Sequence, residues 1–262
     1  MELNTPQGPL FAYTGARDHQ DQQQAVVFIH GTGMDHTVWV LPSRYFARHG
    51  YNVMAIDLPA HGRSKGQPAP TINAMAESVI EAMAAAPVAT AGLVRHSLAS
   101  LAALRAAARY PDRVRSLALI GSTAPMGVHP DMLKYASDND HGVIDMLTYW
   151  GYSKAAQLGG NENPGMWMAG GTLRLLERAA DDIIHIDLDA CRAYDQGLAH
   201  AGSVQCPTLF ILGERDIMTP VRSAQKLIGA VTDAKVCVID GSGHSLMMER
   251  PNDVLDALIG IV

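Results

Sequence analysis

Short apolar runs that alternate with helical patterns constrain the fold of this chain more than any other feature. These runs are apolar on both faces, and they occupy residues 25–30, 52–57, 88–94, 114–120, 207–212 and 235–239. Helical patterns separate them, at residues 39–49, 74–86, 98–109 and 221–229, and a last one begins at Pro251. Strands buried on both faces and separated by helices are typical of a parallel sheet covered on both sides. We therefore predict an α/β fold with a mostly parallel, doubly wound sheet.

The alternation stops after Gly121 and resumes near residue 207. The interval has no convincing strand pattern, and helical patterns fill it at residues 131–135, 143–152, 171–180 and 188–199. A structureless loop of about 80 residues is implausible inside a compact domain. A chain of 262 residues suits one large domain with an insertion better than two domains. We predict a core of residues 1–122 and 204–262, with a helical lid at 123–203.

Composition argues against several kinds of partner. The chain carries 20 Lys and Arg against 26 Asp and Glu, a net charge of −6, and has no long basic run. This balance disfavours nucleic acid or an anionic membrane as the main partner. The three cysteines are too few and too scattered for a disulfide framework or a structural zinc site. Because no signal-peptide pattern or membrane-span length is present, we expect a cytoplasmic protein that acts on a small molecule. The sequence does not determine the oligomeric state.

Two loops that follow predicted strands carry a nucleophile and amide groups. Ser97 lies between the run 88–94 and a helix, which is the arrangement of a nucleophile elbow. A serine N-cap explains this segment equally well. The pattern Gly31-Thr32-Gly33 follows another strand, and a simple glycine turn would also explain it. If Ser97 is a nucleophile, the backbone N–H groups of Thr32 and Leu98 would form its oxyanion hole.

Two further loops supply the base and the carboxylate that such a nucleophile needs. Asp216 follows the run 207–212, and His244 follows the run 235–239. Taken alone, a loop aspartate is usually a cap and a loop histidine is usually a surface residue. Because the carboxyl ends of parallel strands meet at one sheet edge, we expect these groups to converge. In the order Ser97, Asp216, His244 they would form a catalytic triad, in which the carboxylate orients the imidazole base.

With these residues in place, the chain resembles the α/β-hydrolase superfamily over its whole length except the lid. The stretch 57–64, DLPAHGRS, is similar to the D-x-P-G-x-G-x-S turn of that superfamily, with Ala60 in place of the first glycine. The stretch 110–114, YPDRV, resembles the usual start of the following strand, and residues 213–220 resemble the acid loop. The resemblance implies a hydrolase with the triad named above.

The serine at position 97 narrows the reaction that the resemblance implies. Related dehalogenases and epoxide hydrolases carry an aspartate there, so both are disfavoured. We expect a cofactor-independent serine hydrolase, with no metal, that cleaves a small, mostly apolar carboxylic ester through an acyl-enzyme. Hydrolysis of a β-diketone carbon–carbon bond, a thioester or a lactone, and hydroxynitrile lyase chemistry, stay open as alternatives. A non-catalytic, ligand-binding member is a further alternative.

Arg95 departs from the pattern of the superfamily, which usually has glycine two residues before the nucleophile. A long cationic side chain at this point must find room beside the sheet or point outward. We predict that Arg95→Gly retains or increases esterase activity.

Methionine and tryptophan gather near the predicted site. Because methionine adapts to irregular apolar space, we predict an apolar substrate pocket, although plain core packing would use the same residues. The predicted lining residues are Met34, His96, Met126, Trp150, Trp167, Met218 and Met247. Asp187 belongs to an acidic patch, at residues 181–189, that we interpret as a solvated helix end rather than a metal site. His61 is expected to be a structural or surface residue.

Overall fold

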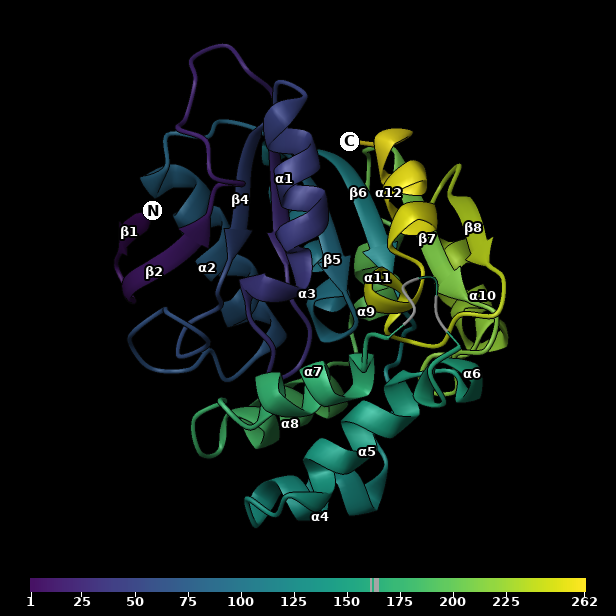
Figure 1. Ribbon diagram of the computed structural model, residues 1–262. Helices are drawn as coiled ribbons and strands as arrows, with labels where there is room; N and C mark the ends of the chain where they lie inside the picture. Colours follow the sequence, from purple (N-terminus) through teal and green to yellow (C-terminus); the bar gives the residue numbers. More distant parts are fainter. Residues whose placement is uncertain (161, 163–164) are drawn as a thin grey trace.

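The computed structural model describes residues 1–160, 162 and 165–262. Eight strands form one sheet in the order β1-β2-β4-β3-β5-β6-β7-β8 (Figure 1). Their bounds are Glu2–Thr5 (β1), Gly8–Tyr13 (β2), Ala25–Ile29 (β3), Asn52–Ile56 (β4), Ala91–His96 (β5), Val114–Ile120 (β6), Thr208–Gly213 (β7) and Lys235–Ile239 (β8). Strands β3 to β8 pair in parallel, and the β1–β2 hairpin adds an antiparallel edge. The predicted doubly wound, mostly parallel sheet is confirmed.

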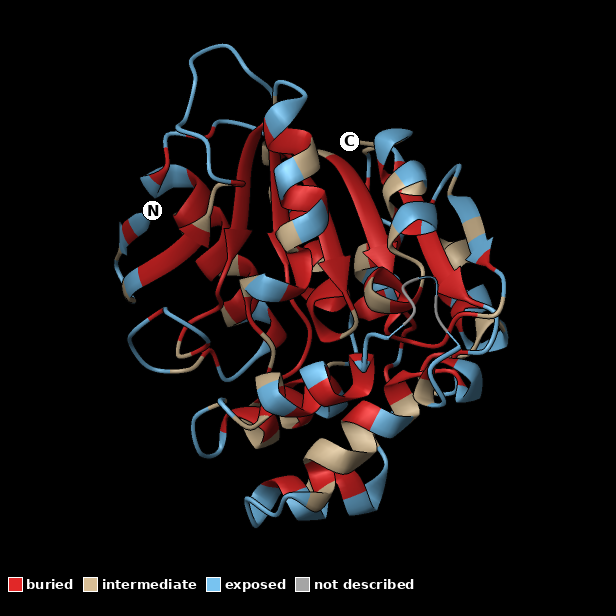
Figure 2. Ribbon diagram, in the orientation of Figure 1, coloured by how far each residue is buried: buried red, intermediate tan, exposed pale blue. Residues whose placement is uncertain are grey.

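Helices cover both faces of this sheet. One face is covered by α2, α3 and α10, and the other by α1, α11 and α12 (Figure 1). The bounds are Val40–Arg48 (α1), Ile72–Ala85 (α2), Leu98–Arg109 (α3), Val221–Ala230 (α10), Leu246–Glu249 (α11) and Pro251–Ile259 (α12). Alternate residues of β3 enter the two hydrophobic cores. Val27 and Ile29 pack in the core under α2, α3 and α10, and Val26 and Phe28 pack in the core under α1, α11 and α12. This double burial explains why the central strands read as continuous apolar runs (Figure 2).

The helices that follow β6 fill the interval before β7. Their bounds are Pro130–Ser137 (α4), Gly142–Gly151 (α5), Lys154–Gln157 (α6), Met168–Leu176 (α7), Ile183–Ala193 (α8) and Gly197–Ala201 (α9). Helices α4, α5, α7 and α8 lie beyond the carboxyl ends of the central strands (Figure 1). Helix α9 instead packs on α3 and α10, among the helices that cover the sheet. The single helix predicted at 188–199 is therefore two helices, separated at residues 194–196.

Strand β5 covers residues 91–96, whereas the sequence predicts a strand at 88–94. The observed strand therefore ends directly before Ser97. The carbonyl oxygens of Val88 and Ala89 accept hydrogen bonds from the Arg113 side chain, so these two residues are not paired in the sheet. Strands β1 and β2 were missed; they form the antiparallel edge of the sheet, and β2 includes Pro9, which cannot donate to a sheet ladder. Across the described residues, no helix combines the length and the apolar character needed to span a bilayer.

Candidate active site

The turn from β5 to α3 forces Ser97 into an unusual backbone conformation. Its φ is +54° and its ψ is −126°, a region that L-residues avoid. The Ser97 N–H donates to the carbonyl of Ile120 at 2.9 Å, and the Ser97 carbonyl accepts from the Ser100 N–H at 2.8 Å. The Ser97 side chain makes no capping hydrogen bond. The strained turn therefore favours a nucleophile elbow over an N-cap.

The loop after β3 lies against this turn. A Cβ atom on Gly31 would come within 2.9 Å of the His96 Nδ1 and 3.4 Å of the Ser97 Cβ, so only glycine allows this approach. Thr32 and Ser97 line one cavity, and Leu98 directly follows Ser97 in the chain. Within the described part of the chain, neither the Thr32 N–H nor the Leu98 N–H donates a hydrogen bond to a backbone or side-chain acceptor. Both donors are free for a substrate oxygen.

Asp216 and His244 meet at the carboxyl ends of β7 and β8. The His244 Nδ1 donates to the Asp216 Oδ2 at 2.8 Å. The other Asp216 oxygen accepts from the backbone N–H groups of Met218 and Thr219, each at 2.8 Å. Although burial by itself raises the pKa of Asp216, His244 and these hydrogen bonds lower that pKa to about 2. Asp216 is thus held as a carboxylate beside the imidazole.

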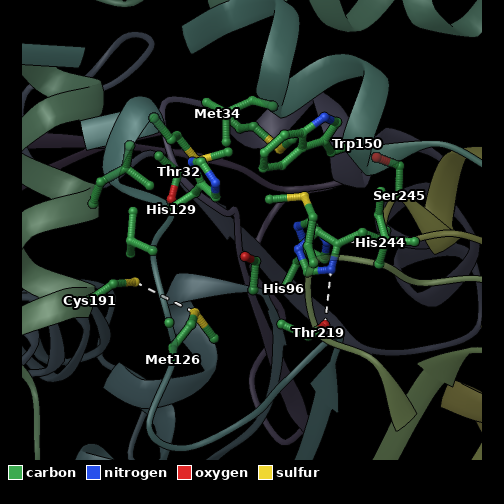
Figure 3. A pocket seen from close by; sticks show the side chains of 18 of the residues that line it. Thr32, Met34, His96, Met126, His129, Trp150, Cys191, Thr219, His244 and Ser245 are labelled. Carbon is green, nitrogen blue, oxygen red and sulfur yellow. Dashed lines mark hydrogen bonds between the residues drawn. The ribbon is translucent and has the colours of Figure 1, made fainter. Parts of the chain in front are cut away.

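Thr219 completes this arrangement, and our sequence reasoning missed it. Its hydroxyl donates to the Asp216 Oδ2 at 2.6 Å and lies 3.1 Å from the His244 Nδ1 (Figure 3). The spacing Asp-x-x-Thr was the available signal, since a threonine three residues after a loop aspartate can bond back to the carboxylate. Thr219 therefore fixes the carboxylate that faces His244.

One hydrogen bond of the predicted triad is not formed. Ser97 and His244 line the same cavity, yet no hydrogen bond joins the Ser97 Oγ to the His244 Nε2. The His244 Nε2 is buried and, among the described residues, has no hydrogen-bond partner. In the neutral ring, a proton on Nδ1 leaves Nε2 as the acceptor. Such catalytic hydrogen bonds are often long in a protein without substrate.

His96 stabilises the position of the His244 backbone. Its Nε2 donates to the His244 carbonyl oxygen at 2.9 Å, and the two ring centroids are 4.7 Å apart. Burial, with a smaller contribution from His244, lowers the pKa of His96 to about 3, so its ring is neutral. We had predicted His96 as a pocket residue; it lines the cavity and also fixes the His244 loop.

A cavity of about 430 Å³ opens beside these groups (Figure 3). The predicted residues Met34, His96, Met126, Trp150 and Met218 line it. Its other side chains are mostly apolar and come from the segment between β6 and β7 and from the acid loop, among them Val128, Met132, Leu147, Leu188, Cys191 and Ile217. Since few polar groups face it apart from the candidate catalytic residues, the cavity suits a mostly apolar ligand.

Two predicted lining residues do not border this cavity. Trp167 is 68% exposed and packs its ring against the Gly170 backbone at the start of α7, so it faces solvent. Met247 is buried in the core between the sheet and α12, because its face of the short helix α11 points toward the sheet. Both predictions were wrong for one reason: composition identifies apolar side chains but not the face on which each packs.

Arg95 is completely buried. Its neighbours in register on β3 and β6, Ile29 and Leu119, are buried aliphatic residues. Within the described residues, none of the three guanidinium nitrogens has a hydrogen-bond partner. Burial lowers the pKa of Arg95 well below its ordinary value. Of the two alternatives posed by the sequence, the side chain is therefore accommodated beside the sheet and does not point outward.

Asp35, His36 and Asp57 place atoms that could bind a metal within 4.8 Å of one another. Protein donors already occupy the oxygens. Asp57 accepts from the backbone N–H of His36 at 2.6 Å and of Arg63 at 2.9 Å, and Asp35 pairs with Arg178. We assign no metal to this cluster, because its carboxylates are engaged within the protein.

Comparison with known proteins agrees with this geometry. The family model for the alpha/beta hydrolase fold matches residues 24–251. A hydrolase of (E)-2-((N-methylformamido)methylene)succinate from Acinetobacter baylyi is 24% identical over 91% of this chain and 90% of its own length. A pimeloyl-[acyl-carrier protein] methyl ester esterase from Chromobacterium violaceum is 27% identical over 89% of this chain and 92% of its own.

Among solved structures, the enol-lactonase from Burkholderia xenovorans LB400 is similar with a TM-score of 0.89 and 18% identity. The match covers 99% of this chain and 98% of that one, so the shared fold extends over both proteins. The family match and the relatives confirm the superfamily and the hydrolase class that the motifs predict. This chain belongs to the alpha/beta hydrolase fold family.

Proposed function

We propose that this protein is a serine hydrolase that cleaves a small, mostly apolar carboxylic ester through an acyl-enzyme on Ser97. The observation that carries the proposal is the strained Ser97 turn, which opens on an apolar cavity shared with His244. The methyl ester esterase among the relatives supports ester cleavage. A cytoplasmic location belongs to the same proposal, as does a lid role for residues 123–203 apart from α9, which packs on the helices that cover the sheet.

In this mechanism the Ser97 Oγ attacks the ester carbonyl while the His244 Nε2 takes the hydroxyl proton. The Asp216 carboxylate, 2.8 Å from the His244 Nδ1, holds the correct tautomer and stabilises the imidazolium. The Thr32 and Leu98 amides would donate to the oxygen that becomes negative, and one such donor is worth about 3 kcal/mol. The imidazolium then protonates the leaving alcohol, and a water molecule hydrolyses the acyl-enzyme by the same route.

A fluorophosphonate probe tests this proposal, because it labels an activated serine. We expect the wild type to be labelled and Ser97→Ala to lose both the label and about six orders of magnitude in kcat on p-nitrophenyl butyrate. Ser100→Ala, one turn along α3, is the matched control and should keep the label, since Ser100 lines no part of the cavity. An unlabelled, folded wild type would contradict the proposal and favour a ligand-binding protein.

A further inference from the structure

A second buried cluster lies next to the proposed oxyanion loop and outside the proposed triad. Asp187, on α8, is 1% exposed, and His61, in the loop after β4, is 4% exposed. The Asp187 Oδ2 lies 3.1 Å from the His61 Nε2 and accepts the backbone N–H of Gly33 at 2.9 Å. One carboxylate oxygen thus connects an inserted helix, the 57–64 turn and the loop after β3. The sequence had suggested a solvated Asp187, and the structure contradicts this.

The geometry requires one proton between His61 and Asp187. The His61 Nδ1 lies 3.0 Å from the Pro59 carbonyl oxygen, which can only accept a hydrogen bond. The His61 Nδ1 therefore donates to Pro59, and the contact between Nε2 and the Asp187 Oδ2 needs one further proton between these two atoms. Burial, the largest single influence, lowers the pKa of His61, but Asp187, the Pro59 carbonyl and Asp57 together raise it above its ordinary value. His61 and Asp187 thus form a buried, hydrogen-bonded pair that fixes the position of the carboxyl group.

The Gly33 amide belongs to the turn that presents Thr32. The Met34 N–H donates to the Gly31 carbonyl oxygen at 3.2 Å, which makes Thr32 and Gly33 the central residues of a β-turn. Gly33 has a φ of +65°, whereas Thr32 is not among the residues with positive φ. This combination defines a type II turn, which differs from type I by a flip of the central peptide group. The flip would replace the Gly33 N–H facing Asp187 with a carbonyl.

Helix α8 also contacts this turn directly. A Cβ atom on Gly33 would lie 2.8 Å from the Ile184 side chain, so the turn and the helix are packed backbone to side chain. The alternative turn would set the Thr32 carbonyl oxygen against the Asp187 carboxylate, which is electrostatically unfavourable. The contact with α8 therefore selects one orientation of the turn.

We propose that Asp187 is a positioning residue, which sets the orientation of the Thr32–Gly33 peptide group and so holds in place the loop that carries the Thr32 amide. His61 acts through Asp187 by holding its carboxyl group in place. The inserted helix α8 is thereby a structural part of the oxyanion hole, and its displacement would disorganise that hole. This inference rests on the proposed esterase activity.

The test uses a double variant, His61→Leu with Asp187→Leu, which removes both partners together. Replacing a whole buried ion pair by apolar residues often preserves stability, so the thermal midpoint should stay within a few degrees of wild type. The turn nevertheless loses its acceptor. We expect kcat on p-nitrophenyl butyrate to fall by roughly 10- to 100-fold, with KM changed by less than about threefold, because the amide acts mainly in the transition state.

Two single variants sharpen the result. Asp187→Asn retains an oxygen that can accept from Gly33, so its kcat should exceed that of the double variant by about fivefold or more. Asp189→Ala is the matched control on the same helix; Asp189 is partly exposed and, among the described residues, forms an ion pair with Arg192 alone, so kcat should not change. A folded double variant with wild-type kcat would overturn the positioning role. Absence of probe labelling in the wild type would instead refute the proposed function.

Discussion

The burial of Arg95 leads to a strong prediction about stability. The buried aliphatic residues Ile29 and Leu119 flank Arg95 in register, and no described group accepts hydrogen bonds from its guanidinium. The effective penalty for burying an ion is several kcal/mol, and an unpaired buried charge destabilises a protein by about 3–5 kcal/mol. Arg95→Met keeps most of the aliphatic stem and removes the charge. After a small loss of packing, we expect the free energy of unfolding to rise by about 2–4 kcal/mol.

Differential scanning calorimetry measures this change. For a domain of this size each kcal/mol shifts Tm by roughly 2–4 °C, so Arg95→Met should melt roughly 5–15 °C higher. Arg222→Met is the matched control, because Arg222 is exposed on α10 and removal of its charge should change Tm little. Arg95→Gly leaves a cavity that offsets much of the gain, so its Tm should stay near that of wild type while its esterase activity is kept or increased.

A pH series gives an independent readout for Arg95. Since burial lowers its pKa in the folded protein, the unfolded chain binds the proton more tightly. The stability of the wild type should therefore rise as pH increases, and its difference from Arg95→Met should shrink at alkaline pH. The reasoning is refuted if Arg95→Met melts at or below the wild-type temperature, since the guanidinium would then have stabilising partners.

Three further predictions concern the 57–64 turn, Asp216 and the cavity. Ala60 has a φ of +65°, where glycine is unstrained, so Ala60→Gly should add about 0.5–1 kcal/mol to the free energy of unfolding by urea denaturation; a lower midpoint would contradict this. The pKa of Asp216 falls from 3.8 to about 2 on folding, so its carboxylate contributes about 2 kcal/mol above pH 4, and this is lost as pH falls toward 2. The stability difference between wild type and Asp216→Asn should shrink over that acid range; a constant difference would exclude the linkage. Met126→Ala enlarges the cavity and should favour longer p-nitrophenyl esters by up to about fourfold in kcat/KM per added methylene; an unchanged profile would remove Met126 from the substrate site.

Much of the architecture could be predicted because it depends on near neighbours in the chain. Burial on both faces makes a central strand such as β3 apolar at every position, and the helices on either side keep a 3.6-residue period. The order of Ser97, Asp216 and His244 could be read from loops, because parallel strands bring their carboxyl ends to one edge. The two edge strands could not be found, since they form an antiparallel hairpin outside the alternation of strands and helices and are not apolar at every position.

The sequence by itself determined the parallel sheet, the residues at its carboxyl edge and the family to which the chain belongs. Only the tertiary structure decided which side chains face the cavity, as the exposed Trp167 and the core residue Met247 illustrate. It also decided that Asp187 is buried against a turn 154 residues away. The reason is physical: strand and helix periods arise from local geometry, whereas the burial of one side chain depends on which distant segment packs against it.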